Sequence, residues 1–374
     1  MRLFFVFFLF FHGFFHALGF ARVFDLGEWA AQPITFELGL FWLAAAILYL
    51  ATGYSFAVNH RRWWMVGFTA VVVSQALVIV EWEYAAWGTL PNAIVFIVCL
   101  ISFAGWQFEI KANREADDLR IMAMNRKTGI SKNNYQNLPE VVKKWMDRSG
   151  VMEAEIPNSV YLTQVGEMRL KEKGNWIPFY ARQWFSLSEP GFVWLARVGR
   201  RKIIQFAGRD KYQMGKGNMM IRAYSFIPVV NDAGPQVDQG SAVRYLSEII
   251  WFPHMALSGQ ITWEDLGDNK AKATMHHVED VEGIFEFGED GFPVSFEAPR
   301  FYGSSGKREM WHIDIGKNIL ESDGVRIPAQ GRVVWKMRTG DFHWLSLEIE
   351  SVEYLTHHDY KGGEGQFEPV VKAS

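Results

Sequence analysis

Two histidines in the first apolar segment are the side chains best placed for chemistry in the first part of this chain. His12 and His16 are four residues apart, so on a helix they share one face. If the segment spans a bilayer, ionisable groups at that depth face a helix bundle or a polar cavity. A proton or metal site would pair them with Gln75 or with a carboxylate such as Glu81. Because no carboxylate is secured at the same depth, we expect neutral histidines hydrogen-bonded to neighbouring helices.

In the second part of the chain the groups that could act as acids or bases are carboxylates. Glu248 could pair with Asp210 or Asp314, but nothing in the sequence brings the members together. His276 and His277 are adjacent, so on a strand they point to opposite faces and cannot share a metal. The chain has neither a Gly-x-Ser-x-Gly nor a His-Glu-x-x-His motif. The sequence therefore identifies no catalytic residue, indicates no metal or cofactor, and leans away from an enzyme.

The composition argues against two further classes. The 374 residues carry a formal net charge of −3 and one cysteine, Cys99. A single thiol cannot build a disulfide framework or a thiolate metal cluster within one chain. Without a cationic excess, no nucleic-acid partner is expected. The oligomeric state is not indicated.

Four apolar runs predict a helical membrane region over residues 1–108. Each is near the ~20 residues that a helix needs to cross hydrocarbon. The runs are Leu3–Phe20, Phe36–Val58, Trp63–Val80 and Leu90–Phe108. The first could instead be a signal peptide with Ala17-Leu18-Gly19 as a poor cleavage site, but we favour a retained helix.

The cationic loops predict the orientation of these helices. Arg61 and Arg62 lie between the second and third runs, and a cluster from Lys111 to Lys127 follows the fourth. Because Lys and Arg concentrate on the cytoplasmic side, both termini are expected there. The chain is thus predicted to be a multi-pass protein of the inner (cytoplasmic) membrane.

The rest of the chain changes character from helical to β-rich. Residues 109–136 form a polar helical connector, residues 137–356 a β-rich soluble domain and residues 357–374 a polar tail. From residue 159 onward apolar side chains alternate with a period of two, and short turn signals separate the runs. We expect a large, curved antiparallel sheet of about eight to ten strands.

One helix, predicted over Ser241–Ala256, should cover this sheet and complete an α+β domain. Seven tryptophans fall on or beside the predicted strands, which is compatible with a wide core or with an aromatic cavity beneath the helix. The candidate ligand-binding residues of such a cavity are Trp194, Arg244, Tyr245, Glu248, Trp251 and Trp263.

Several motifs of the second half resemble an uncharacterised bacterial membrane-anchored family, known as a domain of unknown function. The likeness covers about residues 138–355, and His12–Phe20 resembles the membrane region of some members. The motifs are Leu138-Pro139-Glu140, Val165–Arg169, Trp176–Gln183, Pro190–Arg197, Asp210–Tyr212, Gly215–Met219, Arg244–Glu248 and Trp251–Pro253. The layout is also similar to bacterial lipoprotein-carrier half-barrels, which shelter acyl chains outside the inner membrane. That likeness leaves export of the domain as the alternative to the cytoplasmic side.

These observations lead to a hypothesis with two alternatives. The main interpretation is a membrane-tethered binding module for a lipid or another hydrophobic molecule, with the bilayer as partner. The first alternative is an enzyme that acts on a membrane-derived substrate with acids around residues 241–256. The second is a membrane sensor or transport element that uses His12 and His16.

Overall fold

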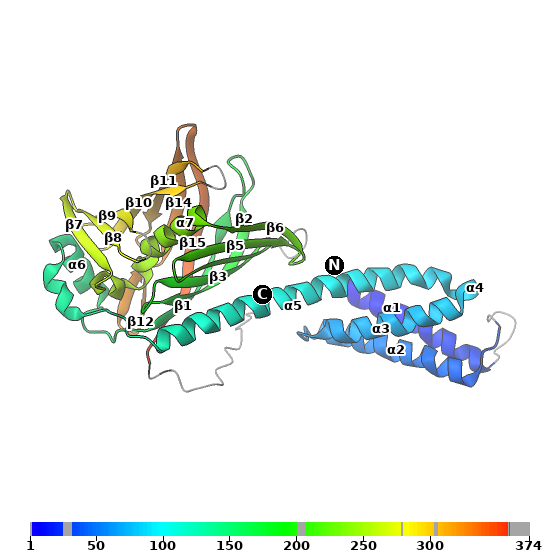
Figure 1. The fold of residues 1–374 in the computed structure, drawn as a ribbon. Coiled ribbons are helices and arrows are strands. Elements are labelled where there is room, and N and C mark those ends of the chain that lie inside the picture. The colour runs from blue at the N-terminus through cyan, green and yellow to red at the C-terminus, as the bar shows by residue number, and fades with distance from the viewer. Residues whose placement is uncertain are drawn as a thin grey trace. The chain divides into compact units, whose positions relative to one another are not determined.

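The computed structural model describes residues 2–24, 32–199, 206–277, 280–302, 306–357 and 359 (Figure 1). The predicted polar tail thus lies almost entirely outside the described residues. The chain divides into a helical unit that ends at Ile110 and a β-rich unit that begins at Lys111.

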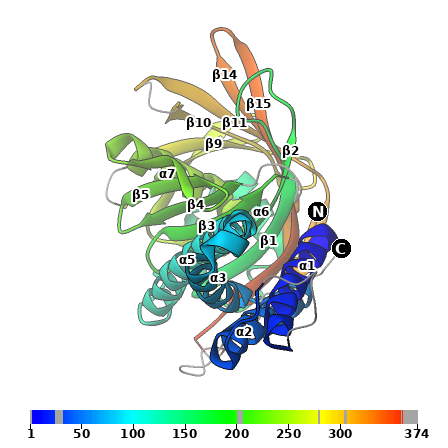
Figure 2. The same ribbon diagram turned by 90° about the vertical axis from the view of Figure 1, so that its right-hand side faces the viewer.

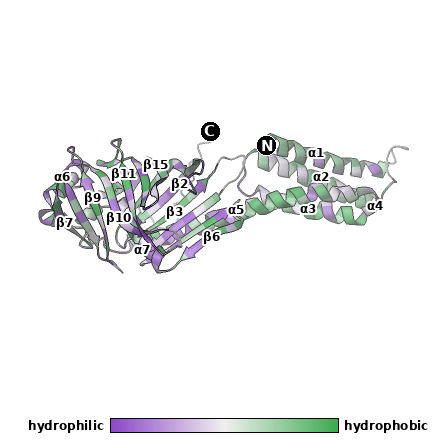
Figure 3. Cartoon of the chain, turned by 90° about the horizontal axis from the view of Figure 1, so that it is seen from above, coloured by the Kyte–Doolittle hydropathy of each residue, from purple (hydrophilic) through white to green (hydrophobic). Residues whose placement is uncertain are grey.

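The first unit contains four helices that are long and apolar enough to cross a membrane, as the sequence predicted. Hydrophobic residues prevail along them (Figure 3), and large apolar side chains such as Phe7, Phe41 and Ile97 are exposed. A water-soluble bundle would bury that surface, so the unit is suited to a membrane. Its elements are α1 (Arg2–Ala21), η1 (Arg22–Phe24), α2 (Phe36–Ala57), α3 (Trp63–Val80), α4 (Trp82–Ala85), η2 (Ala86–Gly88) and the first part of α5 (Thr89–Met124), which continues into the second unit.

Two short helices lead from α5 to the sheet. They are η3 (Lys132–Asn137) and α6 (Glu140–Ser149). Pro139 precedes α6, and Gly150 ends it in the left-handed conformation with φ 79°. Trp145 of α6 is fully buried in the main core, which makes α6 part of the β-rich unit.

The second unit is built on one sheet of thirteen antiparallel strands, in the order β6-β5-β4-β3-β2-β1-β15-β14-β11-β10-β9-β8-β7. The antiparallel prediction is confirmed, but the expected eight to ten strands were too few. Two further strands, β12 and β13, have four residues each and pair in a separate two-stranded sheet, and β6 is exposed along most of its length, so these strands show little of the alternation that the prediction used. The strands are β1 (Ser159–Met168), β2 (Ile177–Ser186), β3 (Gly191–Val198), β4 (Phe206–Gln213), β5 (Lys216–Ala223), β6 (Ile227–Ala233), β7 (Ile261–Gly267), β8 (Lys270–Met275), β9 (Val281–Phe287), β10 (Pro293–Phe301), β11 (Arg308–Ile315), β12 (Ile319–Ser322), β13 (Val325–Pro328), β14 (Gln330–Met337) and β15 (Gly340–Leu355).

A single helix, α7 (Pro235–Glu248), lies against the inner face of this sheet (Figure 2). It packs on β4, β5 and β6 near one end of the strand order and on β9 and β10 near the other, so the sheet curls around it. Register shifts at Thr163/Gln164 and Val333/Val334 mark bulges in central strands, which increase the local twist and bend.

The observed bounds of this helix correct the predicted span Ser241–Ala256. Pro235 begins the helix in its first turn, where its missing N–H costs nothing. Pro253 disfavours the α conformation of the residue before it. The chain therefore continues from Glu248 as two 3-10 turns, η4 (Ile249–Trp251) and η5 (Pro253–Leu257).

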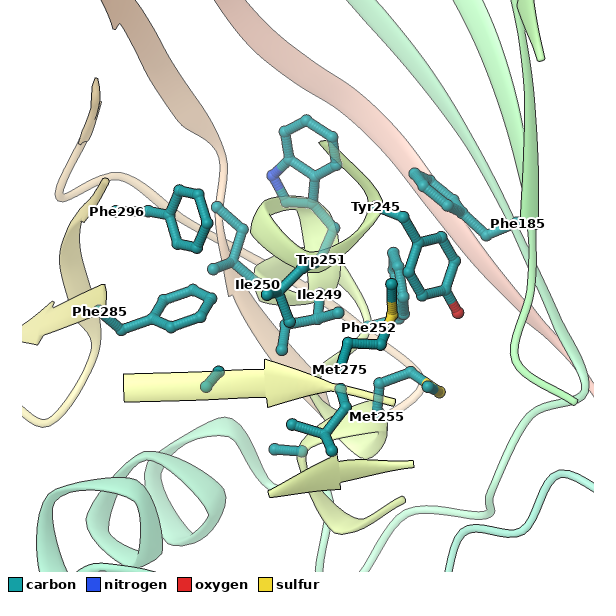
Figure 4. Packing of buried hydrophobic residues seen from close by; sticks show 14 of the residues in the cluster. Phe185, Tyr245, Ile249, Ile250, Trp251, Phe252, Met255, Met275, Phe285 and Phe296 are labelled. Carbon is teal, nitrogen blue, oxygen red and sulfur yellow. The ribbon is translucent and has the colours of Figure 1, made fainter. Parts of the chain in front are cut away.

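The C-terminal end of α7 and these turns form the centre of the core. Tyr245 and Phe252 are fully buried beside Phe185 of β2, and Phe285 and Phe296 approach from the other end of the sheet (Figure 4). Rings from β2, α7, β9 and β10 thus meet in one closed interior. Burial of each such side chain stabilises the fold by about 1.5–3 kcal/mol.

This core contains one titratable side chain whose burial predicts a pH dependence of stability. His254 of η5 is fully buried, and burial together with nearby Lys132 lowers its pKa to about 3. Below pH ~6.5 the unfolded chain binds a proton that the folded core rejects, so the free energy of unfolding should fall by about 1.4 kcal/mol per pH unit until pH ~3. Hydrogen exchange of the amides of residues 249–257, corrected for intrinsic rates, measures this slope.

The replacement His254→Gln should reduce that slope between pH 4 and 6. The matched control is His276→Gln, because His276 is exposed at the end of β8. An unchanged slope in the His254 variant would assign the pH dependence to other groups.

Candidate functional site

A buried ion cluster lies between α7 and the inner face of the sheet. Arg244 of α7 donates from Nη1 to Asp210 Oδ2 of β4 at 2.8 Å and from Nε to Glu248 Oε1 at 2.8 Å. The three side chains expose only 9–15% of their surface. One guanidinium thus neutralises two carboxylates that are 38 residues apart in sequence and that the sequence alone could not join.

Amide side chains extend the cluster across β1, β2 and β3. Gln183 donates to Glu248 Oε2 at 2.8 Å and accepts from Arg244 Nη2 at 3.3 Å. Gln164 donates to Gln183 Oε1 at 3.1 Å, and Trp194 Nε1 donates to Gln164 Oε1 at 3.0 Å. The guanidinium of Arg244 also lies 5.2 Å from the ring centre of Trp194. These hydrogen bonds engage the Arg244 guanidinium and both Glu248 oxygens, which matters because an unpaired buried charge is costly.

A second arginine, Arg300 of β10, lies on the same inner face but contacts aromatic rings rather than carboxylates. Its guanidinium carbon is 4.5 Å from the ring centre of Trp311 and 5.9 Å from that of Trp335. A Cβ on Gly240 of α7 would lie 3.1 Å from Arg300 Nε, so the helix backbone covers the guanidinium closely. No hydrogen bond or ion pair of Arg300 is found among the described residues.

Burial shifts the pKa of two members of this region. It raises the pKa of the Glu248 carboxyl, and the charge and hydrogen bonds of Arg244 and Gln183 offset the shift only in part. Burial lowers the pKa of Arg300 to about 10, while the charge of Asp210 opposes that shift. Arg300 therefore remains a cation at neutral pH.

The structure brings together three of the six predicted ligand-binding residues. Arg244, Glu248 and Trp194 belong to the ion cluster. Tyr245 and Trp251 lie in the closed core, where the Tyr245 hydroxyl donates to the Ser186 carbonyl at 2.8 Å.

Trp263 lies at the β7 end of the sheet, apart from this cluster. Its Nε1 donates to the Ala256 carbonyl at 3.1 Å, and its ring packs on Trp145. Asp314, one of the two suggested partners of Glu248, instead accepts from His312 on the outer face at 3.0 Å.

The interior around Trp251 of η4, just beyond α7, is filled by aromatic and aliphatic side chains. The hollows found in the described part of the chain lie elsewhere. One, of about 440 Å³, lies at β1, β11, β14 and β15, and residues of both faces line it: Gly166, Gly331 and Leu347 from the inner face, and Glu167, Asp314 and Glu348 from the outer face.

Sequence reasoning missed Gln164, Gln183 and Arg300. The alternation of residues along β10 could have identified Arg300. Phe296, Ala298 and Arg300 share one face of this strand, so the arginine follows two core positions. For the glutamines, the residues two positions away on each strand are buried or small, which marks the inner face but not the partner.

The helical unit contains a second buried polar cluster, centred on Asn92 of α5. Its Oδ1 lies 3.0 Å from His12 Nε2, and it accepts from the Tyr49 hydroxyl at 2.6 Å and from the Ser74 hydroxyl at 2.9 Å. His16 Nε2 lies 2.9 Å from Ser74 Oγ. The two predicted histidines are thus hydrogen-bonded to neighbouring helices, as the sequence analysis expected.

The other two predicted membrane residues have separate environments. Gln75 Oε1 accepts from Asn92 Nδ2 at 3.0 Å, so Gln75 is linked to the histidines only through Asn92. Glu81 forms an ion pair with Arg22 at 2.7 Å instead. Among the described residues, no group of three His, Cys, Asp or Glu side chains could hold a metal ion.

Together these features define a protein with four helices long and apolar enough to cross a membrane and a second unit built on a curled antiparallel sheet with one helix against its inner face. The chain belongs to a family of unknown function, DUF6544, whose model matches residues 128–347. This confirms the predicted kinship with an uncharacterised family. The comparison with curated proteins finds no match.

Among solved structures, the chain is similar to a putative outer membrane lipoprotein-sorting protein domain from Vibrio parahaemolyticus. The identity is 12%, the TM-score is 0.35, and the match covers 62% of this chain and 95% of that one. A DUF1329 family protein from Desulfovibrio piger is similar at 10% identity and a TM-score of 0.33, over 58% of this chain and 94% of that one.

The ion cluster leads to a stability prediction. Asp210→Asn should lower the free energy of unfolding by about 3–5 kcal/mol, because it removes one charge from a buried pair and leaves Arg244 underneutralised. The matched control is Asp341→Asn, which breaks the exposed pair with Lys336 and should cost less than about 1 kcal/mol. Hydrogen exchange of β3 and β4 amides in the detergent-purified protein measures both, and equal losses would contradict the prediction.

Proposed function

We propose that this protein is a membrane-anchored binding module for a lipid or another hydrophobic molecule. The observation that carries the proposal is the incomplete burial of apolar side chains that point into the curl of the sheet. At the Tyr245 and Phe252 end of α7 the inward-facing rings are fully buried. Near the ion cluster, Trp194, Leu345 and Leu347 face the same interior and remain partly accessible.

Strand register establishes that these side chains share one face. Leu347 of β15 pairs directly with Gly166 of β1 and with Gly331 of β14, and Leu345 pairs with Val333. Directly paired residues point to the same side of a sheet. The inner face of the central strands therefore presents accessible apolar surface flanked by glycines.

Gly331 leaves room on this surface. A Cβ built there would meet no atom closer than 3.8 Å, and its nearest neighbour is the Leu347 side chain. Apolar surface with a few polar groups at its edge is the usual composition of a ligand site for hydrophobic molecules. The ion cluster and Arg300 supply those polar groups.

The four apolar helices supply the second half of the proposal. A domain that takes up a membrane-derived molecule benefits from a permanent anchor, which raises its effective concentration at the bilayer. We propose that residues 1–108 are this anchor, residues 109–136 the connector and residues 137–356 the binding domain, in the inner membrane of a bacterium. The carboxylates nominated for an enzyme, Asp210 and Glu248, are both engaged by Arg244, which favours binding over catalysis.

A filling substitution should test ligand binding. Gly331→Leu places a side chain on the accessible inner surface and should reduce the lipid that copurifies with the detergent-purified protein at least severalfold, as measured by native mass spectrometry. The matched control, Arg332→Leu, places the same side chain on the opposite face of β14 and should leave the lipid unchanged. A wild-type protein that carries no lipid and binds no hydrophobic fluorescent probe would refute the proposed function.

The side of the membrane forms a separate prediction. Arg61, Arg62 and the basic cluster after residue 110 favour the cytoplasm for the β-rich domain. A fusion of alkaline phosphatase after residue 130 should be inactive, and a cytoplasmic reporter at the same position should be active. Strong phosphatase activity would place the domain on the exported side without affecting the binding proposal.

A further inference from the structure

We propose that the bound molecule is an anionic amphiphile whose carboxylate or phosphate group binds to Arg300. This inference rests on the proposed function, since it specifies the chemistry of the molecule held on the same inner face. It concerns a residue that sequence analysis did not identify and that the ion cluster does not use.

The donor groups of Arg300 have no hydrogen-bond acceptor among the described residues. A guanidinium carries five N–H donors, and those of Arg300 find no hydrogen-bond partner among the residues that the structure describes. The side chain is only partly accessible, because Trp311 stacks on it and Gly240 covers it from the helix. Water can reach this guanidinium only from one side of a largely apolar surrounding, where a charge-assisted hydrogen bond to a ligand oxygen is stronger than on the open surface.

Three of the four oxygens of the neighbouring carboxylates Asp210 and Glu248 accept hydrogen bonds from other residues, and Asp210 Oδ1 is buried without a partner among the described residues. Asp210 Oδ2 and Glu248 Oε1 accept from Arg244, and Glu248 Oε2 accepts from Gln183. Glu309 is the cross-strand partner of Arg300 in the β10–β11 register, yet the described residues show no ion pair between the two. Arg244 has two carboxylates and an amide as hydrogen-bond partners. Arg300, by contrast, is a cation of this interior that has no hydrogen-bonded carboxylate among the described residues.

The aromatic neighbours make Arg300 suitable for an oxyanion. Contact with the Trp311 ring restricts the guanidinium, and the planar fork of an arginine can donate to two oxygens of one carboxylate or phosphate. The rings of Trp311 and Trp335 continue into the apolar inner face, where Val333 pairs with Leu345. One end of a bound molecule would therefore be anionic and the rest apolar.

The test compares ligands that differ only in the charged group. Binding to the full-length protein in detergent at fixed concentration is followed by anisotropy of a fluorescent long-chain fatty acid and competition with unlabelled molecules. The arms are a fatty acid against the alcohol of the same length, and a short-chain phosphatidic acid against the matching diacylglycerol. We expect the wild type to prefer at least one anion over its neutral partner by about tenfold or more, as for a charged hydrogen bond. Preference in the first arm identifies a carboxylate, and in the second a phosphate.

Variants assign the preference to Arg300. R300Q should bind the neutral molecules like the wild type and lose the anion preference, whereas R300K should retain part of it, since it keeps the charge without the planar fork. The matched control is R308Q, because Arg308 is exposed on the adjacent strand. Native thermal stability of each variant is measured alongside, and R300K remains informative if R300Q does not fold.

The outcomes separate the two proposals. A wild type that binds neutral and anionic molecules equally, or an R300Q variant that keeps the preference, overturns the assignment to Arg300 and leaves hydrophobe binding intact. A wild type that binds none of the four molecules overturns the proposed function itself.

Discussion

A sheet of thirteen strands has an inner face far too apolar to remain in water, and one short helix must cover it. Because α7 packs on strands near both ends of the order, it can do so only if the sheet curls around it. The C-terminal end of the helix supplies rings that fill the interior, while its middle supplies Gly240 and Arg244. The ion cluster exists because that arginine is buried and must be neutralised inside the domain.

Packing differs from one end of α7 to the other, so one part of the interior is closed while another remains accessible. Around Tyr245 and Phe252 the side chains are large and the packing is complete. Across the central strands, Gly331 pairs with Leu347 and leaves room beside it, so less side-chain volume is available to close the space. The polar cluster lies between these regions. It holds α7 to β4 and β2 through directional bonds that apolar contacts alone could not specify.

Sequence patterns predicted what depends on local repetition. Hydropathy identified four membrane-length helices, and alternation identified an antiparallel sheet with one covering helix. The number of strands was underestimated, because strands such as β6, which is exposed along most of its length, show no alternation of buried and exposed residues. In the site, the pair of Arg244 and Glu248 could be predicted from the sequence because the two residues are four apart on one helix. Arg300 depends on a long-range approach of β10 to Gly240, and Asn92 on the packing of α5 against His12, so neither could be read from neighbours in the sequence.

The register of the sheet also has a consequence for biosynthesis. β1 pairs with β15, from Ser159↔Leu355 to Met168↔Leu345. The first and the last strand of the domain are therefore neighbours in the middle of the sheet. During translation the strands from β1 to β6 can pair with one another in chain order, but β1 keeps an unpaired edge until β15 has left the ribosome. Such an edge is prone to mispairing with other chains. Loss of the C-terminal part of β15 would leave the domain split into two half-sheets, because β15 alone joins β1 to β14 in the strand order.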